Sequence, residues 1–111
     1  MTYKPIKIIL FHADWCGHCI DFMPEWKTMK SNTKAHKYID FIQYEYATIK
    51  NLDNSIKTIN GKQIDGFPTL KIIINDVEFN YSGNRNRDDI YKFVIDNLNI
   101  QKGGCGCNND R

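Results

Sequence analysis

Two cysteines lie three positions apart in the stretch Trp15-Cys16-Gly17-His18-Cys19, directly after a short apolar run. Thiols at this spacing can close a disulfide with each other, so the pair can give up or accept two electrons. A cysteine at the start of a helix meets unpaired backbone N–H groups and the positive end of the helix dipole, and both lower a thiol pKa. We therefore expect Cys16 to be the nucleophile. Cys19, one helical turn further on the same side, would close the disulfide or resolve a mixed disulfide with a substrate.

The two residues between the cysteines fit this chemistry. Gly17 leaves the turn uncrowded, and His18 supplies a titratable group beside the thiols. A solvated surface histidine is the simpler alternative for His18. The cysteine pair has alternatives too, namely half of a metal site or two buried thiols. An apolar strand pattern before the pair and a helical pattern after it favour the redox interpretation.

A second cysteine pair, Cys105-Gly106-Cys107, lies in the glycine-rich end of the chain. A disulfide within Cys-x-Cys closes a small strained ring and is readily reduced, so on a flexible segment it could carry electrons to or from Cys16 and Cys19. One alternative is an unstructured tail with incidental thiols, and another is a zinc site built from all four cysteines. Because the ligand spacing is unusual for zinc, we predict no metal and no other cofactor.

Length and composition indicate one globular domain. The chain has 111 residues, a 41% hydrophobic share and a formal net charge of +2. We expect a monomeric domain over residues 1–100 and a flexible Gly/Cys tail over residues 101–111. The lysines are scattered among acids and amides, which argues against a nucleic-acid partner. No apolar run approaches the roughly 20 residues that span a bilayer, and no secretory or retention signal is evident. We therefore expect no membrane partner and a cytoplasmic location.

The hydrophobic pattern around the cysteines predicts a strand followed by a helix. The β-branched run Ile6–Phe11 suits a strand that is buried on both faces. From Gly17 to about Lys34, apolar residues recur at intervals of three and four, which predicts a helix. Pro24 falls inside that helix and should bend it. Alternatively, Pro24 ends one helix and a second begins.

The rest of the chain predicts an α/β fold with a four-stranded mixed sheet, in the order βαβαββα, and helices on both faces. Asn60-Gly61 is a helix stop signal, and Asn75-Asp76 is a tight hairpin turn. The remaining elements are a strand at Ile39–Ala47, a helix at Asn51–Asn60, strands at Thr69–Ile74 and Val77–Tyr81, and a helix at Asp88–Leu98.

Several separate motifs, in order, resemble the thioredoxin superfamily. They extend over roughly Ile6–Leu98 and include FHADWCGHC, Pro24, Gly66-Phe67-Pro68-Thr69, and Tyr81-Ser82-Gly83-Asn84-Arg85 followed by Asp88-Asp89-Ile90 and Phe93. The sequence is most similar to a catalytic domain of protein disulfide isomerase, because those domains carry WCGHC where thioredoxins carry WCGPC. The usual first strand and helix have no room here, so the resemblance implies a trimmed thioredoxin fold.

The resemblance also implies roles for residues outside the cysteine pair. Pro68 would be the cis-proline that lies against the cysteines, with the backbone of Phe67 pairing with an extended substrate segment. The simpler alternative is an ordinary proline that opens a strand. Trp15 would pack beside the thiols and offer substrates a flat apolar surface, or be only a half-buried aromatic. Arg85 would approach Cys19 and lower its pKa, although an exposed arginine at a helix entry is an equal alternative.

The Gly17-His18 pair bears on the direction of electron flow. In the resembled family this pair accompanies more oxidising enzymes than Gly-Pro, because a cationic histidine stabilises the thiolate of the first cysteine. On a scale from about −270 mV for thioredoxin to about −180 mV for protein disulfide isomerase, we expect a value nearer the second.

One position departs from the family pattern. Thioredoxins and disulfide isomerases carry a buried Asp or Glu six residues before the first cysteine, as proton acceptor for the second thiol, and here that position is Leu10. His12 lies two residues on, on the same strand face, and Asp14 precedes Trp15. Either residue, or water, could take the proton, and a histidine held by packing is the simpler interpretation of His12. Resolution by Cys19 should then be slow.

Together these features predict a thiol-disulfide oxidoreductase that acts on protein disulfides or dithiols through Cys16 and Cys19. Its partners would be protein thiol or disulfide substrates and a reductase or oxidase that exchanges electrons with the pair. Two alternatives remain. One is a cysteine metal-binding module, and the other is a non-enzymatic thioredoxin-fold protein that captures extended peptides at Phe67-Pro68.

Overall fold

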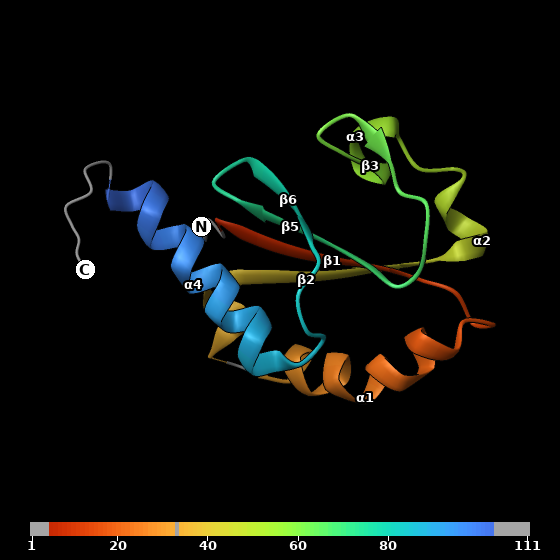
Figure 1. Cartoon of the computed structure of the whole chain (residues 1–111), viewed down its shortest axis with the longest axis horizontal. Coiled ribbons are helices and arrows are strands. Elements are labelled where there is room, and N and C mark those ends of the chain that lie inside the picture. The colour runs from red at the N-terminus through yellow and green to blue at the C-terminus, as the bar shows by residue number, and fades with distance from the viewer. Residues whose placement is uncertain (1–4, 33, 104–111) are drawn as a thin grey trace.

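The computed structural model describes residues 5–32 and 34–103 and contains a four-stranded sheet at its centre (Figure 1). The strand order is β2 (Ile39–Glu45), β1 (Ile6–His12), β5 (Thr69–Ile74) and β6 (Val77–Tyr81). β1 runs parallel to β2 and antiparallel to β5, and β5 pairs with β6 as an antiparallel hairpin. The predicted four-stranded mixed sheet is therefore confirmed.

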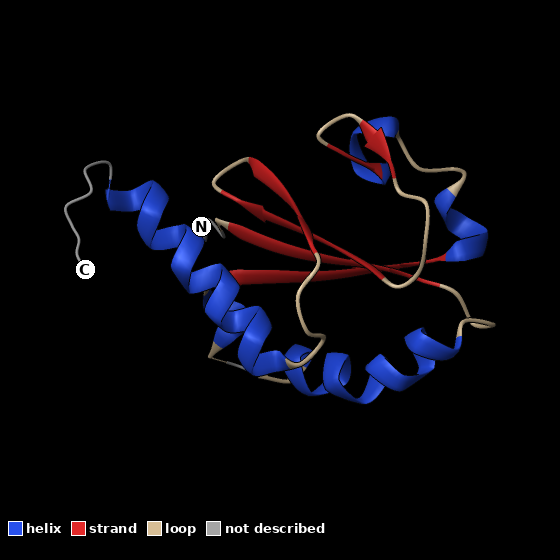
Figure 2. Cartoon of the chain, in the orientation of Figure 1, coloured by secondary structure: helices blue, strands red, loops and turns tan. Residues whose placement is uncertain are grey.

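Helices cover both faces of this sheet, as predicted (Figure 2). The long helices α1 (Gly17–Lys30) and α4 (Arg87–Gly103) lie on one face, and the short helices α2 (Tyr46–Ile49) and α3 (Asn54–Lys57) lie on the other. A single 3-10 turn, η1 (Ala35–Lys37), precedes β2. No helix in the described part of the chain is both long enough and apolar enough to cross a membrane.

Strand β1 is the centre of the fold because both of its faces are buried. Ile8 and Leu10 point into the core beneath α1 and α4, whereas Ile9 and Phe11 pack beneath α2 and α3. This double burial explains why the run has no polar alternation. The end of β1 is therefore held between two packed layers of side chains, one on each face of the sheet, and so is the turn that follows it and carries the cysteines.

Helix α1 is continuous through Pro24, so the alternative of two separate helices is wrong. Its buried residues, Cys19, Phe22, Trp26 and Met29, recur at the predicted intervals. Pro24 itself is exposed, and its carbonyl accepts a hydrogen bond from the Thr28 hydroxyl at 3.0 Å. The helix ends at Lys30 rather than near Lys34.

The helix predicted over Asn51–Asn60 is present but shorter, because α3 spans only Asn54–Lys57. The structure has α2 and α3 on either side of Asp53, whose backbone is extended (φ −60°, ψ 148°), and then a small hairpin of β3 (Thr58–Ile59) and β4 (Lys62–Gln63). Asn60 and Gly61 have φ values of 51° and 86°, which is the geometry that hairpin turns require and that Asn-Gly favours. The Asn-Gly pair is thus a hairpin turn and not a helix stop.

Two other element ends differ from the prediction. β2 stops at Glu45 instead of Ala47, because the Glu45 carboxylate accepts the Ala47 N–H at 2.8 Å and caps α2. α4 continues past Leu98 to Gly103, so the first residues of the stretch predicted as a tail are helical. The hairpin turn at Asn75 and Asp76 is confirmed, with φ values of 49° and 71°.

Lys71 is a buried charge that the sequence interpretation missed. It lies opposite Ile9 in the sheet and is only 1% exposed. Its ammonium group donates to the carbonyl oxygens of Ser55 at 2.9 Å and Ile56 at 3.1 Å, and lies 3.5 Å from the Glu78 carboxylate. Lys71 therefore ties α3 to the sheet.

Candidate functional site

The cysteine pair lies at the junction between β1 and α1. Cys16 is the residue that caps α1, and its Sγ accepts the backbone N–H of Cys19 at 3.3 Å. Both thiols are free, and both residues are buried, with 8% exposure for Cys16 and 2% for Cys19. The sulfur of Cys16 thus lies at the N-terminal end of α1, beside a backbone N–H of the first turn.

The environment of Cys19 is different. Burial, together with a hydrogen bond with the Cys16 thiol, raises the pKa of Cys19 to about 11. A backbone hydrogen bond to Ala13 and the positive charge of Arg85 lower this pKa, but they do not outweigh burial. Cys19 therefore holds its proton at neutral pH and must lose it before it can attack a disulfide.

The loop before β5 lies against the cysteines. The Phe67–Pro68 peptide bond is cis, as predicted, and Pro68 is buried. The Cys16 thiol donates to the carbonyl oxygen of Phe67 at 3.4 Å. The Phe67 ring also packs against the cluster formed by Ala13, Cys16 and Cys19. This contact joins the two motifs that the sequence analysis singled out.

Three aromatic rings form the rim of the site. Trp15 is 68% exposed and packs edge-on against Tyr46 and Phe67, with ring centroids 5.5 Å and 5.9 Å away, and Tyr46 packs edge-on against Phe67 at 5.7 Å. Tyr46 was not among the predicted site residues. A signal for it existed, because β1 and β2 are parallel and their carboxyl ends meet at one edge, where Trp15 and Tyr46 follow.

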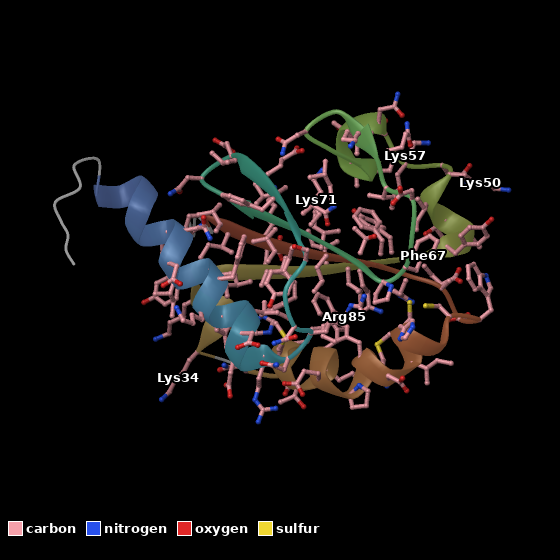
Figure 3. All side chains as sticks on the ribbon, in the orientation of Figure 1. Lys34, Lys50, Lys57, Phe67, Lys71 and Arg85 are labelled. Atoms are coloured by element: carbon pink, nitrogen blue, oxygen red, sulfur yellow. The ribbon has the colours of Figure 1, made fainter. Side chains whose placement is uncertain are left out.

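Arg85 lies in the loop between β6 and α4 (Figure 3), and its charge lowers the pKa of Cys19. The loop is shaped by Tyr81, whose hydroxyl donates to the Asn84 carbonyl at 2.6 Å. A Cβ on Gly83 would lie 2.6 Å from that hydroxyl and 2.8 Å from the ring, so any larger residue there would force the Tyr81 side chain or the loop to shift. Gly83 therefore allows the turn that sets the position of Arg85.

Leu10 is fully buried at the position of the missing acid. His12, at the end of β1, is 8% exposed, and its Nε2 lies 3.5 Å from Nε2 of Gln43. Oε1 of Gln43 accepts the Trp26 indole N–H and the Lys30 ammonium, each at 2.8 Å, so the amide nitrogen faces His12. Because that nitrogen can only donate, Nε2 of His12 is the acceptor and neutral His12 carries its proton on Nδ1.

The remaining predicted residues lie at the surface or outside the described part of the chain. Gly17 and His18 are exposed in the first turn of α1, and no atom lies within 4 Å of a Cβ built on Gly17. Asp14 is exposed, and its N–H donates to the Glu45 carboxylate at 3.5 Å. Within residues 5–32 and 34–103, no cluster of three or more His, Cys, Asp or Glu side chains is placed to share a metal. Cys105 and Cys107 lie outside those residues.

Comparison with known proteins agrees with this geometry. The thioredoxin family model matches residues 2–96. A probable protein disulfide-isomerase A4 of Caenorhabditis elegans is 32% identical over 98 residues, which are 86% of this chain and 15% of that protein. The first thioredoxin domain of mouse protein disulfide-isomerase A4 superposes with a TM-score of 0.60 at 27% identity, over 84% of this chain and 63% of that one.

The fold is also similar to that of a thioredoxin, trimmed as expected, because the described chain begins with the strand that leads into the cysteines. The oxidised thioredoxin of Plasmodium falciparum superposes with a TM-score of 0.57 at 18% identity, over 86% of this chain and 83% of the thioredoxin. The curated relatives are much longer, and the chain spans 15% to 27% of the first three. The match of the family model to most of the chain, together with the four-stranded sheet and the cysteine pair at the start of α1, shows that this chain belongs to the thioredoxin family and is similar to the domains of protein disulfide isomerases.

Proposed function

We propose that the chain is a thiol-disulfide oxidoreductase that acts on protein disulfides and dithiols through Cys16 and Cys19. The observation that carries this proposal is the position of the Cys16 sulfur, which accepts a helix N–H at 3.3 Å and contacts the Phe67 carbonyl at 3.4 Å beneath an exposed aromatic rim. The sulfur is activated by the helix start on one side and bordered by a peptide-binding loop on the other.

The first step is attack by the Cys16 thiolate on a substrate disulfide. A bond forms between Cys16 Sγ and one substrate sulfur, the substrate S–S bond breaks, and the other sulfur leaves as a thiolate. The Cys19 thiol then loses its proton and displaces the bound substrate sulfur. The products are a dithiol substrate and a Cys16–Cys19 disulfide, and the same steps in reverse oxidise a substrate dithiol.

The unequal environments of the two thiols support this division of roles. Burial holds the proton on Cys19, whose pKa is about 11, so Cys19 does not compete with Cys16 for the first attack. Resolution then depends on removing that proton. With Leu10 in place of the family's acid, the acceptor is His12, Asp14 or water, and His12 has an unprotonated Nε2 in its neutral form.

His18 and the aromatic rim refine the proposal. A cationic His18 near the start of α1 stabilises the Cys16 thiolate, which makes the oxidised pair a stronger oxidant. We therefore infer a potential nearer that of disulfide isomerase than that of thioredoxin. The Phe67 backbone and the rings of Trp15 and Tyr46 would hold an extended substrate segment beside Cys16.

Trapping of a mixed disulfide tests the proposal. Cys19→Ala should accumulate a covalent adduct with a peptide or protein disulfide, because the resolving thiol is absent, whereas Cys16→Ala should form little. The adduct is counted by mass spectrometry, with and without a reductant. Reversible binding of peptides without any adduct in Cys19→Ala would instead favour the non-enzymatic peptide-binding alternative.

A further inference from the structure

A cavity of about 550 Å³ lies beside the aromatic rim of the site. It is formed by α2, the end of α3 and the segment that leads to Pro68. Phe67 lines this cavity and also accepts the hydrogen bond from the Cys16 thiol, so one lining residue touches the reactive sulfur. Its lining residues are Tyr46, Ala47, Ile49, Lys50, Lys57, Gln63, Ile64, Asp65 and Phe67.

The charge on this lining is unbalanced. Two lysines, Lys50 and Lys57, face one carboxylate, Asp65. The Lys57 ammonium donates to the Lys50 carbonyl at 3.1 Å, which holds it at the end of α2. The ion pairs among the described residues are Lys71–Glu78, Arg87–Glu25 and Lys92–Asp96. Neither Lys50 nor Lys57 therefore has a carboxylate within pairing distance in the described part of the chain. Figure 3 shows both lysines at the same end of the molecule as Phe67.

The rest of the lining is apolar or aromatic, mainly Tyr46, Ile49, Ile64 and Phe67. A side chain with an aliphatic stem and a carboxylate end would pack its stem on these residues and place its charge near the lysines. We propose that this cavity binds an acidic side chain of the substrate close to the reacting cysteine. This inference rests on the proposed oxidoreductase function and adds a substrate preference to it.

The geometry of an extended segment gives the position of that acidic residue. Side chains alternate along a strand, so residues two apart point the same way and lie roughly 6.5–7 Å from each other. With the substrate cysteine on Cys16 and its backbone along Phe67, the next side chain toward the protein belongs to the residue two positions away. Since Tyr46 and Phe67 line the cavity, we expect that side chain to reach it, and hence selectivity two residues from the cysteine.

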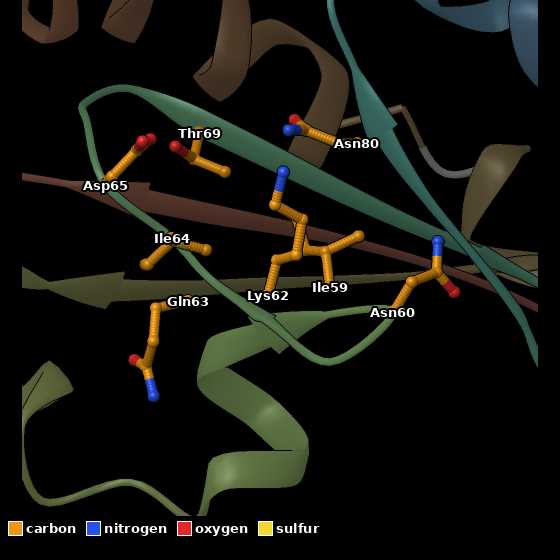
Figure 4. A pocket seen from close by; sticks show the side chains of 8 residues that line it. All are labelled: Ile59, Asn60, Lys62, Gln63, Ile64, Asp65, Thr69 and Asn80. Atoms are coloured by element: carbon orange, nitrogen blue, oxygen red, sulfur yellow. The ribbon is translucent and has the colours of Figure 1, made fainter.

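A neighbouring cavity provides a control. It has a volume of about 250 Å³ (Figure 4), and it shares the lining residues Gln63, Ile64 and Asp65 with the first cavity. Its side chains include Lys62 and Asn80, and neither Tyr46 nor Phe67 lines it. Lys62 thus carries the same charge as Lys57 on the same stretch of chain but has no link to Cys16.

The test is a single-turnover reaction of the reduced full chain with short peptides. Each peptide carries one cysteine in a mixed disulfide with thionitrobenzoate, and has Glu or Gln two residues before or after that cysteine. Attack by Cys16 on the peptide sulfur breaks the S–S bond and releases the coloured thiolate, so the release rate reports the first step. We expect the better Glu peptide to react about two- to fivefold faster than its Gln partner at low ionic strength, and salt to reduce this ratio.

Four variants assign the effect. Lys50→Gln/Lys57→Gln should remove the preference, whereas Lys62→Gln and the charge-matched Lys34→Gln/Lys37→Gln should keep it. Figure 3 shows Lys34 at the end of the molecule away from Phe67. Lys50→Glu/Lys57→Glu should reverse the preference toward peptides with Lys at the same position, a result that misfolding cannot produce.

The outcomes separate this inference from the proposed function. Equal rates for the Glu and Gln peptides, with release observed, would overturn the acidic preference and leave the oxidoreductase function standing. A preference that persists in Lys50→Gln/Lys57→Gln, or one that disappears in Lys62→Gln, would overturn the assignment to this cavity. An absence of release from every peptide would contradict the proposed function and the inference together.

Discussion

The thiol of Cys16 lies 3.4 Å from the carbonyl oxygen of Phe67, a residue that is 51 positions away in the sequence. Because β1 and β5 are neighbours in the sheet, the turn after β1 and the loop before β5 meet at one edge. The contact therefore follows from strand order, and it places the nucleophile against the backbone that would hold a substrate.

Replacing Leu10 should change how fast the second thiol reacts. In the wild-type chain, resolution of a Cys16 mixed disulfide should be slow at neutral pH and rise with pH toward about 11, the pKa of Cys19. Leu10→Glu places a buried carboxylate, whose pKa burial raises, at the family position of the base. We expect it to speed resolution by about tenfold or more at neutral pH, measured in single turnovers by quenched flow.

Leu10→Gln is the matched control, because glutamine has nearly the same shape as glutamate but cannot take the proton. Its resolution rate should equal that of the wild type. His12→Ala addresses the other acceptor. An unchanged rate in His12→Ala would remove His12 from the mechanism, and an unchanged rate in a folded Leu10→Glu variant would show that proton transfer does not limit resolution.

The raised pKa of Cys19 predicts a pH dependence of stability. Below about pH 9 the thiol is protonated in the folded and unfolded chains, so the folded state keeps its full stability. Between about pH 9 and 11 the unfolded chain loses this proton while the folded chain keeps it. The unfolding free energy of the reduced protein should therefore fall by ~1–3 kcal/mol over that range, as measured by urea denaturation.

Two proteins serve as controls for this fall in stability. The oxidised protein has no titrating thiol at Cys19, and Cys19→Ala has none in either redox state. Both should lose less stability than the reduced wild type between pH 9 and 11. Identical pH profiles for reduced wild type and reduced Cys19→Ala would contradict the raised pKa.

Gly83→Ala should disturb the site from a distance. Its new Cβ would collide with the Tyr81 hydroxyl and ring, and because that hydroxyl bonds the loop at Asn84, we expect the loop and Arg85 to shift. Since the charge of Arg85 lowers the pKa of Cys19, we expect slower resolution in Gly83→Ala and in Arg85→Gln. Gly17→Ala is the comparison, because nothing lies within 4 Å of a Cβ at Gly17. Equal resolution rates in Arg85→Gln and wild type would show that the Arg85 charge does not affect resolution by Cys19.

Lys71→Ala should destabilise the fold by ~2–4 kcal/mol. The substitution removes three polar contacts of the ammonium group and leaves a cavity between α3 and the sheet. Thermal or urea denaturation measures the loss, and Lys92→Ala, which breaks an exposed ion pair, should cost much less, because water screens that pair. Similar values for the two variants would mean that Lys71 is not an anchor.

The sequence predicted the parts of the fold that depend on local pattern. The apolar run of β1, the spacing in α1 and the turn at Asn75-Asp76 are all signals contained in neighbouring residues, and each element is present. The helix predicted over Asn51–Asn60 was too long, because the apolar spacing there fits a helix throughout, whereas Thr58 and Ile59 pair with β4 and end α3 at Lys57. That pairing competes with the local preference and is decided by tertiary contacts.

The site shows the same division. The positions of Cys16, Cys19 and Pro68 could be predicted because each belongs to a short motif. Tyr46 belongs to the aromatic rim, and Lys71 bonds α3 beneath the sheet, only through contacts with residues far away in the sequence. Neither has a local motif, so each could be placed only after the register of the strands was known.

The reduction potential of the Cys16–Cys19 pair tests the central claim most directly. The chain is equilibrated with glutathione redox buffers, the thiols are trapped by acid and alkylation, and the fractions of dithiol and disulfide are counted by mass spectrometry. We expect a reversible two-electron couple at about −180 mV, with His18→Pro shifted toward about −270 mV. A pair that forms no disulfide in any buffer would contradict the oxidoreductase function, and a wild-type value near −270 mV would contradict the role assigned to His18.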